Sequence, residues 1–142
     1  MNVVVSIPYT GTRFLKTRLR ILRHVHTTCS WQQITSEVAD YNIIAPLRDP
    51  KDCWDSATRR WRDLTTPFDV SRFIQGWMMM HAVTLWRQVD FIPVDLQHDK
   101  RITDWTPIGD TDPGKATRYE PAIDLKFIYE LPFVKQYYHG PR

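Results

Sequence analysis

The sequence predicts an α/β domain with three layers, in which helices flank a mostly parallel central sheet. Three short apolar runs support this prediction, because each has the length and composition of a buried strand: Val3–Ile7, Asn42–Leu47 and Phe91–Leu96. Segments with helical spacing separate them, as expected for parallel strands joined by crossover helices. At 142 residues the chain is most simply one domain, covering residues 1–142.

The helices are predicted from apolar spacing and from residues that start or stop a helix. Pro8 ends the first strand, and Ser30 and Asp69 are good N-caps for the helices that follow them. Pro132 should interrupt the last helix. In chain order, the predicted helices cover residues 14–22, 31–39, 50–63, 70–87 and 123–138.

Composition restricts the classes of function and the compartment. The net charge of +3 is mild and comes without the basic run typical of nucleic-acid-binding tails, although it suits an anionic cofactor. Two cysteines without a signal peptide indicate free thiols in a reducing compartment. No apolar stretch is long enough to cross a membrane. We therefore expect a cytoplasmic protein that binds neither nucleic acid nor membrane.

The first candidate site is the turn Thr10-Gly11-Thr12, between the first strand and the first helix. Glycine can adopt the positive φ of a tight turn, and the flanking hydroxyls can donate hydrogen bonds. Such a turn directs backbone N–H groups to one point, where phosphate or sulfate oxygens fit. It lacks the G-x-x-x-x-G-K-[ST] spacing of a nucleoside-triphosphate loop, so alone it is more typical of an ordinary capped turn without a ligand.

The second candidate site begins at Arg48, directly after the second of these apolar runs. Open α/β sheets bind their ligands at the carboxyl ends of the strands, where Arg48 is expected. Asp49 can cap the following helix, and Pro50 fits its first turn. Ser56 follows Arg48 by about two helical turns, so its hydroxyl and the guanidinium could share one phosphate.

Together these two motifs resemble the cofactor motifs of the sulfotransferase family, which uses 3′-phosphoadenosine 5′-phosphosulfate (PAPS). The family's 5′-phosphosulfate loop reads Pro-Lys-Ser-Gly-Thr before an apolar helix, and residues 8–15 here read Pro-Tyr-Thr-Gly-Thr-Arg-Phe-Leu. The family's 3′-phosphate motif is Arg-(Asn/Asp)-Pro-(Lys/Arg)-Asp, followed by a serine eight positions after the arginine. Residues 48–52 and Ser56 match it at every position.

The resemblance implies a P-loop-like nucleotide-binding fold and an enzyme that transfers a sulfuryl group from PAPS to a hydroxyl or amine. The product nucleotide would be adenosine 3′,5′-bisphosphate (PAP), and the acceptor a small molecule or glycan. Carried over position by position, the resemblance assigns the 5′ end of the cofactor to the loop and helix start, that is to Thr10, Gly11, Thr12, Arg13 and Phe14. It assigns the 3′-phosphate to Arg48 and Ser56.

Residue 9 departs from the family's pattern, which has a lysine there to steady the sulfuryl group and the bridging oxygen. Tyr9 can donate one hydrogen bond but carries no positive charge at neutral pH. We expect Arg13 to substitute as the cation, since it lies at the start of the helix, whereas Lys16 is expected on the solvated helix surface. Two alternatives remain: a non-catalytic nucleotide-binding or structural protein on the same fold, and a P-loop nucleotide kinase-like enzyme.

The family often uses a histidine or glutamate base near the cofactor sulfate, and the candidates here are His24 and His26. If residues 24–28 form a strand, alternation places both imidazoles on one face. His26 lies nearer the carboxyl end and is the preferred base. A His-x-His metal pair needs further ligands, and Cys29 and Cys53 lack zinc-site spacing, so we expect no metal.

The second half of the chain provides less specific signals. Residues 97–121 are polar and rich in Pro, Gly and Asp, which predicts a long loop. Within it Lys115 and Arg118 resemble the family's basic loop over the 3′-phosphate, although a solvated loop fits equally well. The methionines at 78–80 are expected in the core rather than in an acceptor pocket. The pair Tyr137-Tyr138 could pack on the sheet or form a homodimer contact.

Overall fold

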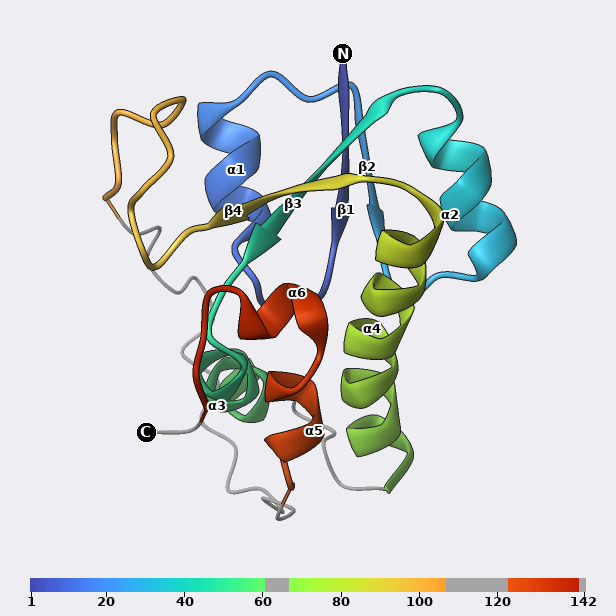
Figure 1. Ribbon diagram of the computed structural model, residues 1–142, viewed down its shortest axis with the longest axis vertical. Coiled ribbons are helices and arrows are strands. Elements are labelled where there is room, and N and C mark those ends of the chain that lie inside the picture. Colours follow the sequence, from blue (N-terminus) through green and yellow to red (C-terminus); the bar gives the residue numbers. More distant parts are fainter. Residues whose placement is uncertain (61–66, 107–122, 141–142) are drawn as a thin grey trace.

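The computed structural model describes residues 1–60, 67–106 and 123–140, and for residues 59–60 and 67–69 it describes the backbone only (Figure 1). Its described part contains a four-stranded sheet in which every pair of neighbours is parallel, in the order β2-β1-β3-β4. The predicted α/β class is therefore confirmed. The strands are β1 (Asn2–Ser6), β2 (Arg23–His26), β3 (Asn42–Leu47) and β4 (Val89–Pro93).

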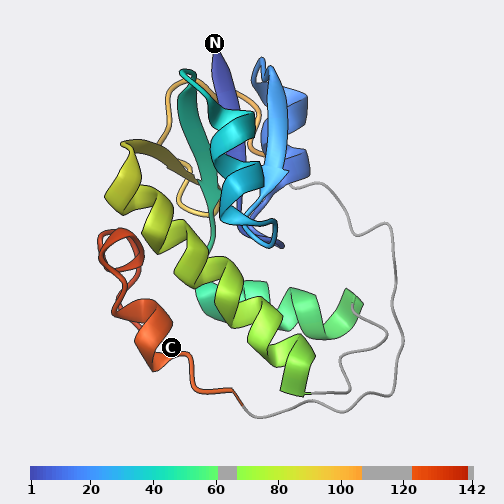
Figure 2. The same cartoon turned by 90° about the vertical axis from the view of Figure 1, so that its right-hand side faces the viewer.

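Helices cover both faces of the sheet, which gives the three predicted layers (Figure 2). On one face α1 (Thr12–Arg18) contributes Phe14 and Leu15 to a small apolar cluster with Ile44 and Ile92. On the other face lie α2 (Trp31–Val38) and α4 (Pro67–Trp86). There α4 approaches the carboxyl end of β1 closely, since a Cβ at Gly76 would lie 3.2 Å from Thr27 Oγ1 and 3.5 Å from Ile7 Cγ2.

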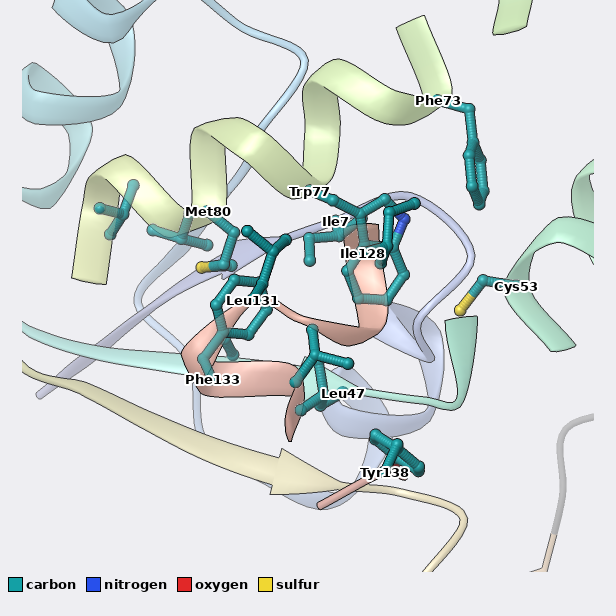
Figure 3. Close-up of a cluster of buried hydrophobic side chains, with 14 of the residues drawn as sticks. Ile7, Leu47, Cys53, Phe73, Trp77, Met80, Ile128, Leu131, Phe133 and Tyr138 are labelled. Carbon is teal, nitrogen blue, oxygen red and sulfur yellow. The ribbon is translucent and has the colours of Figure 1, made fainter. Parts of the chain in front are cut away.

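The larger apolar cluster lies where α4 meets the sheet and three further helices (Figure 3). These are α3 (Pro50–Arg60), α5 (Lys126–Tyr129) and α6 (Pro132–Lys135). The Trp77 side chain is fully buried there and stacks on Phe133, with ring centroids 6.3 Å apart. Burying an aromatic side chain of this size stabilises the fold by about 2 to 3 kcal/mol. The C-terminal helices are therefore part of the core.

The prediction that the methionines at 78–80 lie in the core is confirmed for two of the three and wrong for Met78. Met80 is fully buried and Met79 packs against the core, while Met78 is exposed. No helix in the described part of the chain is long and apolar enough to cross a membrane.

Several predicted boundaries of the helices are wrong. The first helix ends at Arg18 rather than at residue 22, because Leu19 adopts an extended backbone (φ −125°, ψ 150°). Leu19 and Ile21 instead pack against the small apolar cluster from the loop after the helix. The apolar spacing therefore indicated correctly that these residues are buried, but not that they are helical. The fourth helix begins at Pro67, which suits a first-turn position, and Asp69 is therefore inside it.

The last strand and the last helix also differ from the prediction. The β4 strand covers residues 89–93 rather than 91–96, and its first residues are only partly buried because it lies at the edge of the sheet. After it the chain turns, with Gln97 at φ 56°. The predicted terminal helix is two helices of four residues each, separated just before Pro132, so the predicted interruption is confirmed.

Candidate functional site

The two candidate motifs leave the sheet from neighbouring strands. Strands β1 and β3 lie side by side in parallel, with Val3 opposite Ile43, so the turn after β1 and Arg48 after β3 follow the same edge. From β1 the chain passes to β2 on one side, whereas from β3 it passes to β4 on the other. The connections therefore diverge between these strands, which is the topological switch point where open α/β sheets bind ligands.

Gly11 holds the turn in a conformation that other residues adopt at a cost. Its backbone is left-handed (φ 102°, ψ 33°), and an added Cβ would lie 3.1 Å from Val94 Cγ2. Thr10 is fully buried, and its hydroxyl donates to the Ile7 carbonyl at 2.6 Å. Because a hydroxyl has one proton, that of Thr10 orders the turn, and only its backbone N–H can donate to a ligand. Thr12 is half-buried and Arg13 exposed, both in the first turn of α1.

Tyr9, at the position of the family's lysine, also has a positive φ of 70°. This region is costly for a bulky side chain, and such residues concentrate at functional sites. The ring is half-buried and packs against the larger apolar cluster. Tyr9 therefore has a structural role in the turn as well as a place in the candidate site.

A network of hydrogen bonds lies directly after Arg48, at the ends of β3 and β4. The Asp49 carboxylate accepts from the Lys51 backbone N–H at 3.0 Å, which confirms it as the cap of α3, and it also accepts from the Tyr129 hydroxyl. Asp95 accepts from the Asp49 backbone N–H at 2.9 Å and from the Tyr138 hydroxyl. Two tyrosines of the C-terminal segment thus anchor the loops that follow two strands.

Ser56 is buried in α3, three residues after Cys53. Cys53, one helical turn earlier, directs its thiol to the Arg48 carbonyl at 3.8 Å. Because residues three apart share a helix face, Cys53 and Ser56 lie on the face of α3 that contacts the Arg48 backbone. Burial raises the pKa of Cys53 well above its usual value, so its thiol is inert at neutral pH.

Carboxylates surround Arg48 and affect how it can receive an anion. Burial, and next the Asp49 carboxylate, raise the pKa of Asp52, whereas Arg48 opposes the shift. Asp55 accepts from the Lys51 ammonium at 2.7 Å, so that lysine is paired within its own helix. A phosphate at Arg48 would therefore lie in acidic surroundings, which weakens its binding.

A second cluster lies at the neighbouring strand ends, on the α1 face of the sheet. His24 and His26 form part of β2 with ring centroids 4.3 Å apart, so the predicted shared face is confirmed. Both approach the buried Ser6 hydroxyl, at 2.7 Å for His24 Nε2 and 3.2 Å for His26 Nδ1. Sequence reasoning missed Ser6. The signal was a polar residue ending an apolar strand, and only the register places it opposite His26.

The histidines are neutral at physiological pH. Burial lowers the pKa of His24 to about 4, with further lowering from His26 and Lys16. Burial also lowers the pKa of His26, while a hydrogen bond with the Ser6 backbone opposes the shift and Lys16 adds to it. Lys16, expected to be merely solvated, is thus close enough to act electrostatically on both rings. A neutral imidazole can accept a proton, as a general base must.

Three expected cofactor contacts lie elsewhere or outside the described residues. Phe14 is 8% exposed, with the Arg18 guanidinium over its ring at 3.9 Å and Trp105 stacked at 5.7 Å, so its side chain packs in the core. Lys115 and Arg118 fall outside the described residues. Within the described ranges, no cluster of three or more His, Cys, Asp or Glu side chains is arranged to hold a metal.

Comparison of the chain with protein-family models, with curated proteins and with solved structures found no match.

Proposed function

We propose that this chain is a sulfotransferase that moves a sulfuryl group from PAPS to a hydroxyl or amine of a small-molecule or glycan acceptor. The observation that carries the proposal is the pairing of β1 with β3, because it brings the Gly11 turn and Arg48 to the two sides of the switch point. A nucleotide with separate 5′ and 3′ phosphate groups suits two anion-binding loops that leave adjacent strands.

The residues divide between the two ends of the nucleotide. Backbone amides of the Gly11 turn and the Arg13 guanidinium would bind the 5′-phosphosulfate, and the left-handed glycine leaves room that a Cβ would fill. Arg48 and Ser56 would bind the 3′-phosphate. PAPS supplies an activated sulfuryl group, and His26 is the base for the acceptor.

Two observations favour a second candidate, a non-catalytic nucleotide-binding or structural protein on the same fold. Tyr9 is half-buried against the larger apolar cluster, at the position where the family has its lysine. In addition, the carboxylates near Arg48 weaken its attraction for a phosphate.

Calorimetry with PAP tests the cofactor assignment. We expect measurable binding, and Arg48→Ala should weaken it about 10- to 100-fold, the loss typical of one charge-assisted hydrogen bond to phosphate. Arg20→Ala is the matched control, since this arginine is exposed and lies beyond the other end of α1. Absence of PAP binding by the parent protein would refute the proposal.

Transfer of radiolabelled sulfate from PAPS to phenols, glycans and small alcohols then tests catalysis. Transfer to any acceptor separates the enzyme from the binding protein, and Tyr9→Lys should increase the rate because it restores the family's cation. Binding of PAP without transfer to any acceptor would favour the second candidate.

Both cysteines are free thiols, Cys53 in the core and Cys29 half-buried, which supports a reducing compartment such as the cytoplasm.

A further inference from the structure

The cluster of Ser6, His24 and His26 determines which nitrogen of each imidazole is protonated. The register sets Ser6 of β1 beside His26 of β2, and paired residues of parallel strands point to the same face. The Ser6 hydroxyl lies within hydrogen-bonding distance of His24 Nε2 at 2.7 Å and of His26 Nδ1 at 3.2 Å. The one Ser6 hydroxyl is therefore within hydrogen-bonding distance of both imidazole rings.

Counting protons distinguishes the two hydrogen bonds. The Ser6 hydroxyl has one proton, so it donates to one ring and must accept from the other. The two distances differ as the two kinds of hydrogen bond do, because a hydroxyl donor usually lies about 2.7 to 2.8 Å from its acceptor, whereas an N–H donor usually lies about 2.9 to 3.0 Å away. The longer contact, 3.2 Å from Ser6 Oγ to His26 Nδ1, is therefore the one in which the ring donates, so His26 Nδ1 carries the proton. The shorter bond is then the one in which Ser6 donates to His24 Nε2.

We infer that Ser6 is a positioning residue that holds His26 in the Nδ1–H tautomer, so that Nε2 is the atom that accepts the acceptor's proton. This inference rests on the proposed sulfuryl transfer. Ser6 itself is fully buried and cannot act as a nucleophile. His26 is exposed overall, so its outer nitrogen can meet a substrate.

The tautomer gives the transfer step a complete proton balance. The acceptor oxygen forms its bond to sulfur while the bond from sulfur to the 5′-phosphate oxygen breaks, and PAP leaves with that electron pair. The acceptor's proton passes to His26 Nε2. The resulting imidazolium keeps its Nδ1–H bonded to Ser6 and later releases the Nε2 proton to solvent.

Long-range ¹H–¹⁵N NMR on ¹⁵N-histidine-labelled protein at pH 7.5 reads the tautomers without any assay of activity. We expect His24 and His26 both as Nδ1–H in the parent protein. In Ser6→Ala the His26 signal should move toward Nε2–H, with the exposed His98 unchanged as an internal reference. His26 found as Nε2–H in the parent protein, or unaffected by Ser6→Ala, would overturn the inference.

Kinetics with the acceptor found in the transfer screen tests the catalytic half. Ser6→Ala should lower kcat on the order of tenfold or more while the KM for PAPS stays within about twofold, and Ser6→Thr, which retains the hydroxyl, should restore most of the rate. A changed tautomer with unchanged kcat would overturn the positioning role. If the parent protein transfers no sulfate, the proposed function fails, whereas the spectra still decide what Ser6 does to the rings.

Discussion

Gly11→Ala should destabilise the protein through two separable effects in the turn after β1. The left-handed backbone at φ 102° costs an L-residue about 1 to 2 kcal/mol. The new Cβ would also lie 3.1 Å from Val94 Cγ2 and 3.4 Å from Cγ1, closer than the usual separation of carbon atoms. Relieving that contact costs about 1 to 2 kcal/mol more. We therefore expect the free energy of unfolding to fall by about 2 to 4 kcal/mol.

Urea denaturation of three variants measures the two effects. Gly140→Ala is the matched control for the backbone term, since Gly140 has φ 114° and an added Cβ would meet no atom of the described residues within 4 Å. Gly140→Ala should therefore cost only about 1 to 2 kcal/mol. Placing Gly11→Ala in a Val94→Ala background should recover the steric part, as a double-mutant cycle.

The result that would refute this reasoning is a Gly11→Ala variant no less stable than Gly140→Ala. A loss at Gly11 that Val94→Ala leaves unchanged would refute the steric part alone. Calorimetry with PAP on the same variant then asks whether the left-handed turn matters for binding beyond its effect on stability.

Three further predictions concern the rest of the fold. Because the pKa of His24 is about 4 in the folded state against 6.5 in the unfolded chain, the unfolded state binds the proton first, and stability should fall as pH drops from 6.5 to 4. In urea titrations, His24→Gln should reduce this pH-dependent loss of stability by about 1 to 2 kcal/mol, a figure discounted for solvent screening. A dependence of stability on pH that is the same in both proteins would contradict the lowered pKa of His24. Tyr138→Phe should cost about 1 kcal/mol at pH 7 by removing the hydrogen bond to Asp95. Since burial and Asp95 raise the pKa of Tyr138, the parent's stability should also decline above about pH 10, and Tyr138→Phe should flatten that decline in thermal melts. On α4, Met80→Ala should lower the free energy of unfolding in urea by about 2 to 4 kcal/mol, because this side chain is fully buried. Leu85, on the same helix, is 77% exposed, so Leu85→Ala should change that free energy by less than about 0.5 kcal/mol. Similar losses at both positions would show that burial does not control their effect.

The sequence predicted those strands and helices well in which the pattern of apolar and capping residues matches the burial that the fold imposes. The strand Asn42–Leu47 has the predicted bounds, since it is apolar and buried from Ile43 onward and lies inside the sheet. The helix from Trp31 begins where Ser30 caps it, with the serine oxygen accepting from the Gln33 N–H at 3.1 Å. At the edge strand β4 the two signals disagree, because an exposed Asp90 lies within a real strand.

The candidate site was predictable as two loops, whereas its tertiary contacts were not. Strand ends and capping residues indicated where the Gly11 turn and Arg48 lie along the chain. The contact between Gly11 and Val94 and the bond from Tyr138 to Asp95 join segments more than forty residues apart. No local pattern encodes such pairs, because they depend on which strands become neighbours.

The parallel sheet has a consequence for synthesis of the chain, because β1, one of its two inner strands, is made before the other three. Val3 of β1 pairs with Arg23, 20 residues later, and Asn2 pairs with Asn42, 40 residues later. At about 5 to 20 residues per second, β1 waits about 2 to 8 s on the ribosome for its second neighbour. During that time the run Val3-Val4-Val5 has one edge open to other chains. A strand that is fully buried in the folded protein from Val3 onward is therefore exposed to aggregation while it waits for its neighbours during synthesis.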